Sequence, residues 1–191
     1  MHNELVKSEW FDDPGNEPVR LVEHNPDWAI QALDWALRIQ AAIGPLAESV
    51  EHIGSTGVPG LVAKTVLDLL VAVPDIADEP AYRYGLESLG LVLRQRETDR
   101  RFFRPPAGEL RTVHVHVCEA GLPWEQEHLV FRDRLRADAS LAGAYANLKR
   151  ELARSVGHDR LAYTAGKSQL IKDVVDGKLP RDLSGRFLNE L

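Results

Sequence analysis

The sequence predicts an α/β fold (more strictly α+β) in which a sheet layer is followed by a helical portion. Two observations lead to this prediction. Between residues 49 and 118, stretches rich in β-branched and aliphatic residues alternate with turn-forming glycines and prolines. From Trp124 onward the apolar residues recur at helical spacing. We therefore expect one compact unit with a crevice between the sheet and about three C-terminal helices.

Length and composition bound what the protein can be. A chain of 191 residues suits one domain, and we expect an arm at 1–18, the domain at 19–178 and a tail at 179–191. The net charge of −6 argues against general binding to nucleic acids or anionic membranes. No apolar run approaches the ~20 residues of a membrane span, and a single cysteine, Cys118, excludes an internal disulfide. We therefore expect a cytoplasmic protein, with the oligomeric state left open.

The first helix is predicted over residues 25–44. Asn25 is a good N-cap, Pro26 suits the first helical position, and Gly44 followed by proline ends the helix. The residues expected to face the core are Ile30, Leu33 and Leu37, widened by Trp28, Trp35 and Ile39.

The sheet strands are predicted next. "SVEHI" is a short strand that ends at Gly54, and "TVLDLLVAV" is typical of a central strand because its apolar run is nearly continuous. "RTVHVHVC" alternates as a half-buried strand does. The segments expected between these last two are a helix near 78–90 and strands at 91–97 and 101–104.

Three helices are predicted after the sheet. They cover residues 124–138, 140–157 and 158–177. Ser140 is expected to cap the second helix, and Gly177 to end the third.

Asp68 stands inside the apolar run, where an unpaired carboxylate costs several kcal/mol to bury. On a strand, Leu67 and Leu69 point to one face, and Asp68 and Leu70 to the other. Asp68 either lies on the floor of a cleft and holds a divalent metal, or sits in water on an edge strand. The unbroken apolar run favours the cleft.

His114 and His116 alternate with valines, so both project from the same face of their strand. Imidazoles at this spacing bind a transition metal or contact phosphate, or else lie on the wet side of a sheet. His52, two residues before Gly54, is a candidate for the same cluster.

A glycine-serine turn follows the first strand of the sheet. Gly54 turns the chain, and Ser55 and Thr56 follow. Free backbone N–H groups at such a turn, with the Ser55 hydroxyl, suit a phosphate-sized anion. Such turns are common, so the pattern alone does not distinguish an anion site from a plain turn.

Two Tyr-x3-Lys pairs occur in the helical portion, Tyr145 with Lys149 and Tyr163 with Lys167. Within each pair the two side chains share a helix face. Two lysines directed into one crevice would neutralise a polyphosphate, with a tyrosine stacked on a base or bonded to a phosphate. Either pair alone is more often core packing with the lysine reaching to solvent.

Three other residues are weaker candidates. Arg101 and Arg104 flank two phenylalanines and have the length to reach the cleft. Cys118 is expected to pack as a small apolar residue rather than act as a nucleophile.

The assembled motifs resemble the GrpB family, which belongs to the nucleotidyltransferase superfamily of the DNA polymerase beta type. The resemblance covers about residues 19–176 and rests on "NPDW", "VEHIGSTGVPGLVAKTVLDLLV", "RFFR", "HVHV", "FRDRLRAD", "YANLKRELA" and "YTAGKSQLI". It implies a nucleotidyltransferase-like mixed sheet flanked by helices. It also implies a divalent metal, a nucleoside triphosphate, and transfer of the nucleoside monophosphate to the hydroxyl of an unknown acceptor.

Carried over by position, Gly54 and Ser55 match the turn that grips the triphosphate, and Asp68 matches the first metal-binding carboxylate. Leu70 stands where the second carboxylate is expected, and the histidines stand on the strand of the third. One aspartate with neutral imidazoles supplies too little charge for two Mg²⁺ ions. The alternatives are one metal, a histidine-tolerant ion, or nucleotide binding without turnover.

The resemblance and the motifs together predict three kinds of site residue. The expected catalytic residues are Asp68, His114 and His116, and the expected metal ligands are Asp68, His116 and His52, for Mg²⁺ or Mn²⁺ with Zn²⁺ as an alternative. The expected nucleotide-binding residues are Gly54, Ser55, Thr56, Lys64, Lys149, Tyr163 and Lys167. The competing hypotheses are a non-catalytic nucleotide or anion binder and a single-metal phosphohydrolase.

Overall fold

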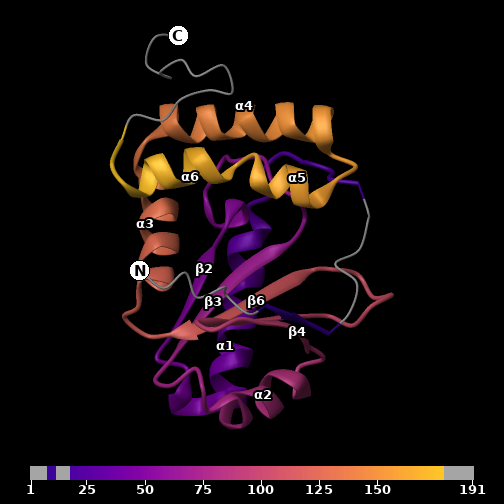
Figure 1. The fold of residues 1–191 in the computed structure, drawn as a ribbon, viewed down its shortest axis with the longest axis vertical. Coiled ribbons are helices and arrows are strands. Elements are labelled where there is room, and N and C mark those ends of the chain that lie inside the picture. The colour runs from indigo at the N-terminus through magenta and orange to yellow at the C-terminus, as the bar shows by residue number, and fades with distance from the viewer. Residues whose placement is uncertain (1–7, 12–17, 179–191) are drawn as a thin grey trace.

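A six-stranded mixed sheet with helices on both faces forms the protein (Figure 1). The computed structural model describes residues 8–11 and 18–178. The predicted tail at 179–191 lies outside the described residues, as does most of the predicted arm.

The strands run in the order β1-β4-β5-β6-β3-β2. β3 and β6 are parallel, and the other neighbouring pairs are antiparallel. The predicted central strand is β3, which is therefore an interior strand that runs back beside β2. The bounds are β1 (Glu9–Trp10), β2 (Ser49–Ile53), β3 (Leu67–Val73), β4 (Val92–Arg96), β5 (Arg100–Arg104) and β6 (Val113–Glu119).

The register between β3 and β6 decides which side chains share a face. Asp68 stands opposite His114, and Leu70 stands opposite His116. The alternation of side chains therefore sends these residues to one face of the sheet. The residues between them, such as Leu69, are fully buried in the main core on the other face.

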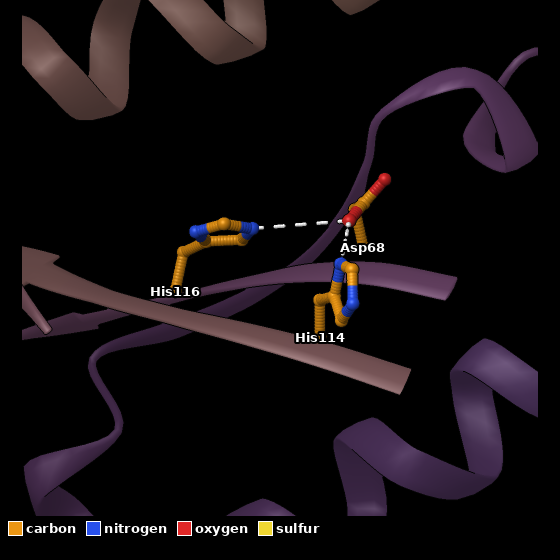
Figure 2. A group of neighbouring side chains, drawn as sticks. All are labelled: Asp68, His114 and His116. Atoms are coloured by element: carbon orange, nitrogen blue, oxygen red, sulfur yellow. Dashed lines mark hydrogen bonds and ion pairs between the residues drawn. The ribbon is translucent and has the colours of Figure 1, made fainter. Parts of the chain in front are cut away.

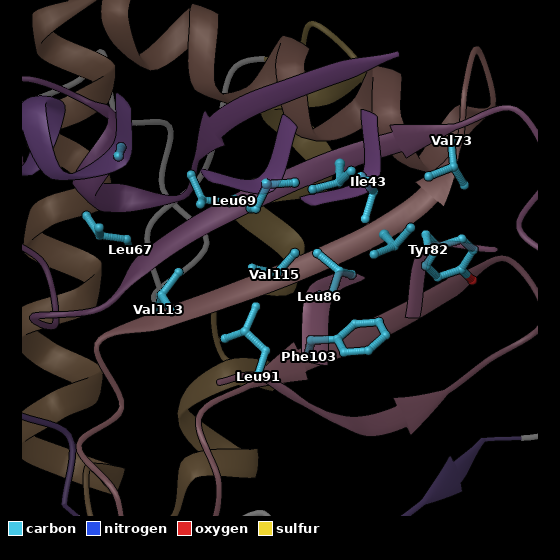
Figure 3. Packing of buried hydrophobic residues seen from close by; sticks show 14 of the residues in the cluster. Ile43, Leu67, Leu69, Val73, Tyr82, Leu86, Leu91, Phe103, Val113 and Val115 are labelled. Carbon is cyan, nitrogen blue, oxygen red and sulfur yellow. The ribbon is translucent and has the colours of Figure 1, made fainter. Parts of the chain in front are cut away.

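Two helices cover that core face, α1 (Asp27–Ile43) and α2 (Glu79–Ser88). Figure 3 shows Ile43 of α1 and Leu86 of α2 among the strand residues Leu69, Val115 and Phe103. Helix α1 ends at Ile43, as the glycine that follows it predicts, and a short 3₁₀ turn, η1 (Gly44–Leu46), begins at Gly44. The helix begins one residue later than predicted, with Pro26 rather than Asn25 as its N-cap residue. The Asn25 side chain still accepts a hydrogen bond from the Asp27 N–H at 3.0 Å.

The buried face of α1 differs from the predicted one. Ile30, Leu33 and Leu37 are 70, 61 and 58% exposed. The buried residues of the helix are Trp28 and Ile39, which were predicted to flank that face, together with Ala32 and Ile43. Their spacing of four, seven and four residues also follows one helix face, and the larger side chains at its ends fill the core.

Up to residue 178, where the described part of the chain ends, four helices follow β6, and three were predicted. They are α3 (Pro123–Ala137), α4 (Ala139–Val156), α5 (Arg160–Ala165) and α6 (Ser168–Val175). The segment predicted as one helix is interrupted at Gly166, where an added Cβ would lie 2.5 Å from the end of the Leu152 side chain of α4, so a larger residue would require that side chain to shift. Asp138 rather than Ser140 caps α4, because its carboxylate accepts hydrogen bonds from the N–H groups of Ser140 and Leu141.

No helix in the described part of the chain is long and apolar enough to cross a membrane.

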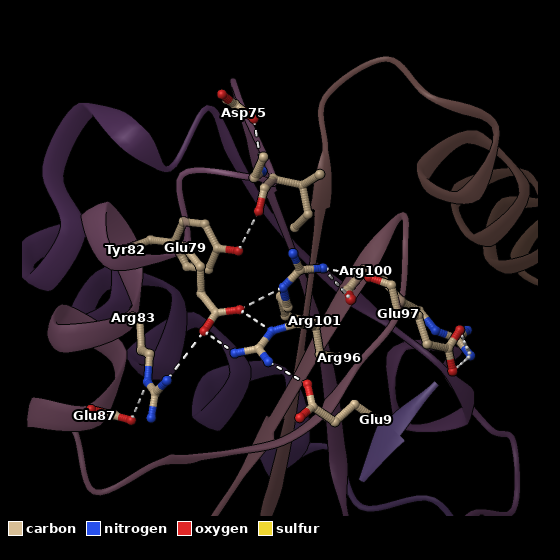
Figure 4. Close-up of polar contacts among 12 residues, drawn as sticks. Glu9, Asp75, Glu79, Tyr82, Arg83, Glu87, Arg96, Glu97, Arg100 and Arg101 are labelled. Atoms are coloured by element: carbon tan, nitrogen blue, oxygen red, sulfur yellow. Dashed lines mark hydrogen bonds and ion pairs between the residues drawn. The ribbon is translucent and has the colours of Figure 1, made fainter. Parts of the chain in front are cut away.

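An ion-pair network fixes α2 against the sheet (Figure 4). The Glu79 carboxylate accepts hydrogen bonds of 2.8 Å from Arg96 and Arg101, which stand on β4 and β5. Arg83 of α2 also donates to Glu79. Arg101 therefore lies on the α2 side of the sheet, and the prediction that it reaches the cleft is wrong.

Candidate functional site

A pocket of about 720 Å³ lies between the helices that follow β6 and the face of the sheet that carries Asp68, His114 and His116. All the predicted site residues except His52 line it. Arg104 is not among the lining residues. Cys118 is buried with Leu70 in a small apolar cluster between the sheet and α3, and burial raises the pKa of its thiol to about 12.

Asp68, His114 and His116 form the candidate metal centre on the sheet side of the pocket (Figure 2). Asp68 Oδ1 is 3.1 Å from His114 Nδ1 and 3.8 Å from His116 Nε2. One ligand atom from each residue lies within 4.8 Å of the other two, and the described residues contain no second group of this kind. Two imidazoles and a carboxylate suit a transition metal better than Mg²⁺.

The two histidines allow Asp68 to keep its charge in the pocket. Burial opposes ionisation, but the hydrogen bond from His114 and the nearby ring of His116 outweigh it and hold the pKa of Asp68 well below its usual value. Burial also lowers the pKa of His114, so its ring is neutral and donates its Nδ1 proton to the carboxylate. A bound cation would replace that proton.

His52 lies apart from these three residues. It stands opposite the core residue Leu69, and its Nε2 is 2.9 Å from Thr56 Oγ1. The Thr56 hydroxyl donates to the Val66 carbonyl at 3.3 Å, so it accepts the His52 proton. Burial lowers the pKa of His52 to about 4. His52 is therefore a neutral side chain that holds Thr56, in the turn after Gly54, by a hydrogen bond.

Gly54 brings that turn directly against Asp68. It has a left-handed backbone, with φ of +67°, and it precedes the 3₁₀ turn η2 (Ser55–Gly57). An added Cβ would lie 2.5 Å from Asp68 Oδ2. Only glycine meets both requirements, the positive φ and the close approach.

Lys149 reaches the same turn from α4. Its Nζ donates to Ser55 Oγ at 2.8 Å and to the Val62 carbonyl, and it lies 4.7 Å from the centre of the Tyr145 ring. The residue is 2% exposed. Burial, followed by repulsion from Lys167, lowers the pKa of Lys149 to about 7.

Lys167 and Lys64 complete a cluster of ammonium groups. Lys167 stands between α5 and α6, with its Nζ 4.7 Å from the centre of the Tyr163 ring. Burial and the charge of Lys64 lower the pKa of Lys167 to about 8, and burial also lowers the pKa of Lys64. A polyanion in the pocket would relieve this repulsion.

The lining residues that the sequence did not indicate include Arg100, Phe102 and His128. Arg100 and Phe102 alternate on β5, and His128 lies one helical turn after Trp124 on α3. The alternation on β5 was a detectable signal. The position of His128 depends on how α3 crosses the sheet, which the sequence does not show.

Comparisons with known proteins agree on one family. The model of the family described as "GrpB protein" matches residues 18–176. The "UPF0157 protein SCO7215" of Streptomyces coelicolor is 43% identical over 153 residues, which is 80% of this chain and 80% of that protein.

Solved structures confirm the predicted fold class. The conserved protein GrpB from Enterococcus faecalis superposes with a TM-score of 0.73 and 30% identity, covering 83% of this chain and 96% of that one. The Cid1 poly(U) polymerase solved with Mg 3′-dATP bound has a TM-score of 0.56 at 11% identity, over 78% of this chain and 50% of that one. The second likeness shows that the fold resembles that of nucleotidyltransferases.

Proposed function

This chain belongs to the GrpB family, and from that premise we propose that it transfers a nucleoside monophosphate from a nucleoside triphosphate to an acceptor hydroxyl. The observation that carries the proposal is one pocket in which the Asp68, His114 and His116 group lies beside a turn bound by a buried lysine. A nucleoside triphosphate and its cation require a metal centre next to a turn that binds anions.

The donor set fits a single cation. Asp68, His114 and His116 offer three convergent ligand atoms, and Leu70, at the position of a second carboxylate, is fully buried in an apolar cluster. The histidines favour Mn²⁺ or Zn²⁺ over Mg²⁺. When bound, the cation would neutralise charge on the phosphate oxygens.

The triphosphate is held by residues on the other side of Asp68. Lys149, Lys167 and Lys64 supply positive charge, and Ser55 supplies a hydroxyl at the start of η2. The lysines start with lowered pKa values, so an arriving anion raises these values and the amines take up protons. Binding is therefore coupled to proton uptake near neutral pH.

In the proposed reaction, the acceptor oxygen forms a bond to the α-phosphorus. The bond from that phosphorus to the oxygen of the leaving pyrophosphate breaks, and the hydroxyl proton passes to water. The protein contributes orientation, since Lys149, which donates to Ser55 Oγ, and the neighbouring lysines fix the triphosphate.

Thermal unfolding with each nucleoside triphosphate, alone and with Mg²⁺, Mn²⁺ or Zn²⁺, tests the binding step. We expect the melting temperature to rise most with nucleotide and Mn²⁺ or Zn²⁺ together. Asp68→Asn should abolish the cation-dependent part while circular dichroism shows an intact fold. Asp34→Asn, an exposed carboxylate on α1, is the matched control and should change nothing. A cation effect of equal size in Asp68→Asn would refute the proposal.

A second candidate function is nucleotide binding without turnover. The buried Leu70 favours it, because a second metal-binding carboxylate is missing from that position. Pyrophosphate release with cell extract as the source of acceptor separates the two. Release that Asp68→Asn abolishes supports transfer, whereas saturable binding without release supports the non-catalytic binder.

A further inference from the structure

The pocket extends beyond the metal centre to Gln95, Arg100, Phe102 and His128, which we call the acceptor end. We propose that the acceptor end binds a small acceptor that carries both a planar ring and an anionic group, such as a nucleoside monophosphate. This inference rests on the proposed transfer function and adds the class of the second substrate.

The sheet order places the two ends of the pocket on opposite sides of the metal centre. β5, which carries Phe102, pairs with β6, and β6 and β3 carry the candidate ligands. β2 and the Ser55 turn lie on the far side of β3. A triphosphate on the Ser55 side therefore leaves the β5 side for the group that attacks its α-phosphorus.

Phe102 provides an aromatic surface at the acceptor end. Its ring stacks on His116 with centroids 5.0 Å apart and meets His114 edge-on at 5.0 Å. These contacts fix the ring while it still lines the pocket. Aromatic surfaces of this kind bind planar bases by stacking in nucleic-acid complexes.

Arg100 provides the positive charge at the acceptor end. Its Nη2 is 2.7 Å from Glu97, whose carboxylate also accepts a hydrogen bond from Gln95. The side chain remains 33% exposed. A guanidinium has five N–H donors, so one contact with Glu97 leaves donors to hold an anionic group in a fixed direction.

His128 provides a hydrogen-bond acceptor for the attacking hydroxyl. Its Nδ1 is 2.7 Å from the Trp124 carbonyl oxygen, which can only accept, so Nδ1 carries the proton and Nε2 has a lone pair. Stacking on Trp124, with centroids 3.8 Å apart, fixes the ring. Burial lowers the pKa of His128 to about 4, which keeps the ring neutral.

Calorimetry on the intact protein tests the binding class. The protein is first saturated with Mn²⁺ and a non-hydrolysable triphosphate, and is then titrated with AMP, adenosine or ribose 5-phosphate. We expect AMP to bind at least tenfold more tightly than adenosine, which lacks the anion, and than ribose 5-phosphate, which lacks the ring. Arg100→Gln should remove the advantage of AMP over adenosine, and Phe102→Leu should remove its advantage over ribose 5-phosphate. Arg83→Gln, on the α2 side of the sheet, is the control and should change neither.

The outcomes separate this inference from the transfer function. Binding of the triphosphate analogue without any binding of AMP overturns the acceptor end alone. Failure of the analogue to bind overturns the transfer function itself. AMP affinity that is unchanged in both Arg100→Gln and Phe102→Leu also overturns the acceptor end.

The role of His128 has its own readout. With AMP as the acceptor, His128→Phe should lower the rate of pyrophosphate release at least tenfold and leave the dissociation constant of AMP within twofold. His128→Gln, whose amide oxygen can accept in place of Nε2, should recover part of the rate. Equal rates in wild type and His128→Phe exclude the role.

Discussion

At the scale of single residues, the position of the Asp68 carboxylate and the absence of a side chain at Gly54 depend on each other. The carboxylate keeps its charge because His114 and His116 donate to it or face it at short range. Gly54 lets the backbone of the turn pass directly over the same carboxylate. The cost of placing an aspartate in an apolar strand is therefore offset by two neighbouring imidazoles on β6.

Gly54→Ala should damage the site more than the fold. The left-handed backbone at this position is strained for alanine, and the new Cβ collides with Asp68 Oδ2, so Asp68 must move. We expect loss of the cation-dependent thermal shift and a destabilisation of about 1–3 kcal/mol, measured by urea unfolding. Gly90→Ala has a similar positive φ with no atom near the added Cβ, and it should keep the cation effect. A cation response retained in Gly54→Ala would contradict this account of the turn.

Lys149 predicts how stability depends on pH. Its pKa is about 7 in the folded protein and 10.5 in a free lysine, so between these values the unfolded chain binds more protons. The stability of the unliganded protein should therefore rise with pH from 7 to 10, by at most about 1.4 kcal/mol per pH unit for one proton. Urea unfolding at pH 7, 8 and 9 should show a smaller rise for Lys149→Met than for wild type. Lys178→Met, an exposed control, should follow wild type, and identical slopes in all three proteins would refute the assignment.

The residues that the sequence did reveal are those whose local pattern is unusual. An aspartate in an apolar run, two alternating histidines and two Tyr-x3-Lys pairs all lie in one pocket. His128 and Arg100 were missed because a histidine on a helix and an arginine on a strand are ordinary locally. Their meaning depends on which face of the sheet they meet.

At the scale of elements, α1 shows where periodicity is insufficient. Both of its faces carry apolar side chains, and the face with Ile30, Leu33 and Leu37 is the exposed one. The choice is made by the partner surface, since α2 and the core face of the sheet bury Ile39 and Ile43. The lengths of the strands were predictable because turns bound them on both sides.

Glu79 joins α2 to β4 and β5, and its removal should loosen all three elements. Its pKa is lowered to about 2, mainly by hydrogen bonding from Arg96, so its contribution is complete above pH 4.5 and lost as the pH falls toward 2. Glu79→Gln should cost about 3 kcal/mol because it leaves Arg101 buried without its anion. Glu87→Gln, which breaks only the pair with Arg83 within α2, should cost about 0.5 kcal/mol. Equal costs in chemical unfolding would show that the network is not a link between elements.

At the scale of the whole molecule, the pocket is assembled from segments far apart in the chain. Asp68 comes from β3, the histidines from β6, and the two lysines from α4 and the connection between α5 and α6. The family resemblance supplied this arrangement, because composition and periodicity alone do not place helices over a particular sheet face.

Ligand binding should therefore change backbone hydrogen exchange in several elements that are far apart in the chain. With Mn²⁺ and a triphosphate analogue, we expect backbone hydrogen exchange to slow in η2, in α4 and in α5 together, because the ligand bridges Ser55, Lys149 and Lys167. Mass spectrometry of exchanged peptides measures this. Slowing confined to η2 would mean that the helices do not contact the ligand.

The lowered pKa of Lys167 has a chemical consequence. An amine with a pKa of about 8 is unprotonated in about a tenth of molecules at pH 7 and in about half at pH 8, and the free amine adds to aldehydes to form an imine. Pyridoxal 5′-phosphate combines an aldehyde with a phosphate, so it should form an imine with Lys167 that borohydride fixes permanently. Prior occupation by a nucleotide would shield the amine, and the labelled peptide would mark the pocket by covalent chemistry.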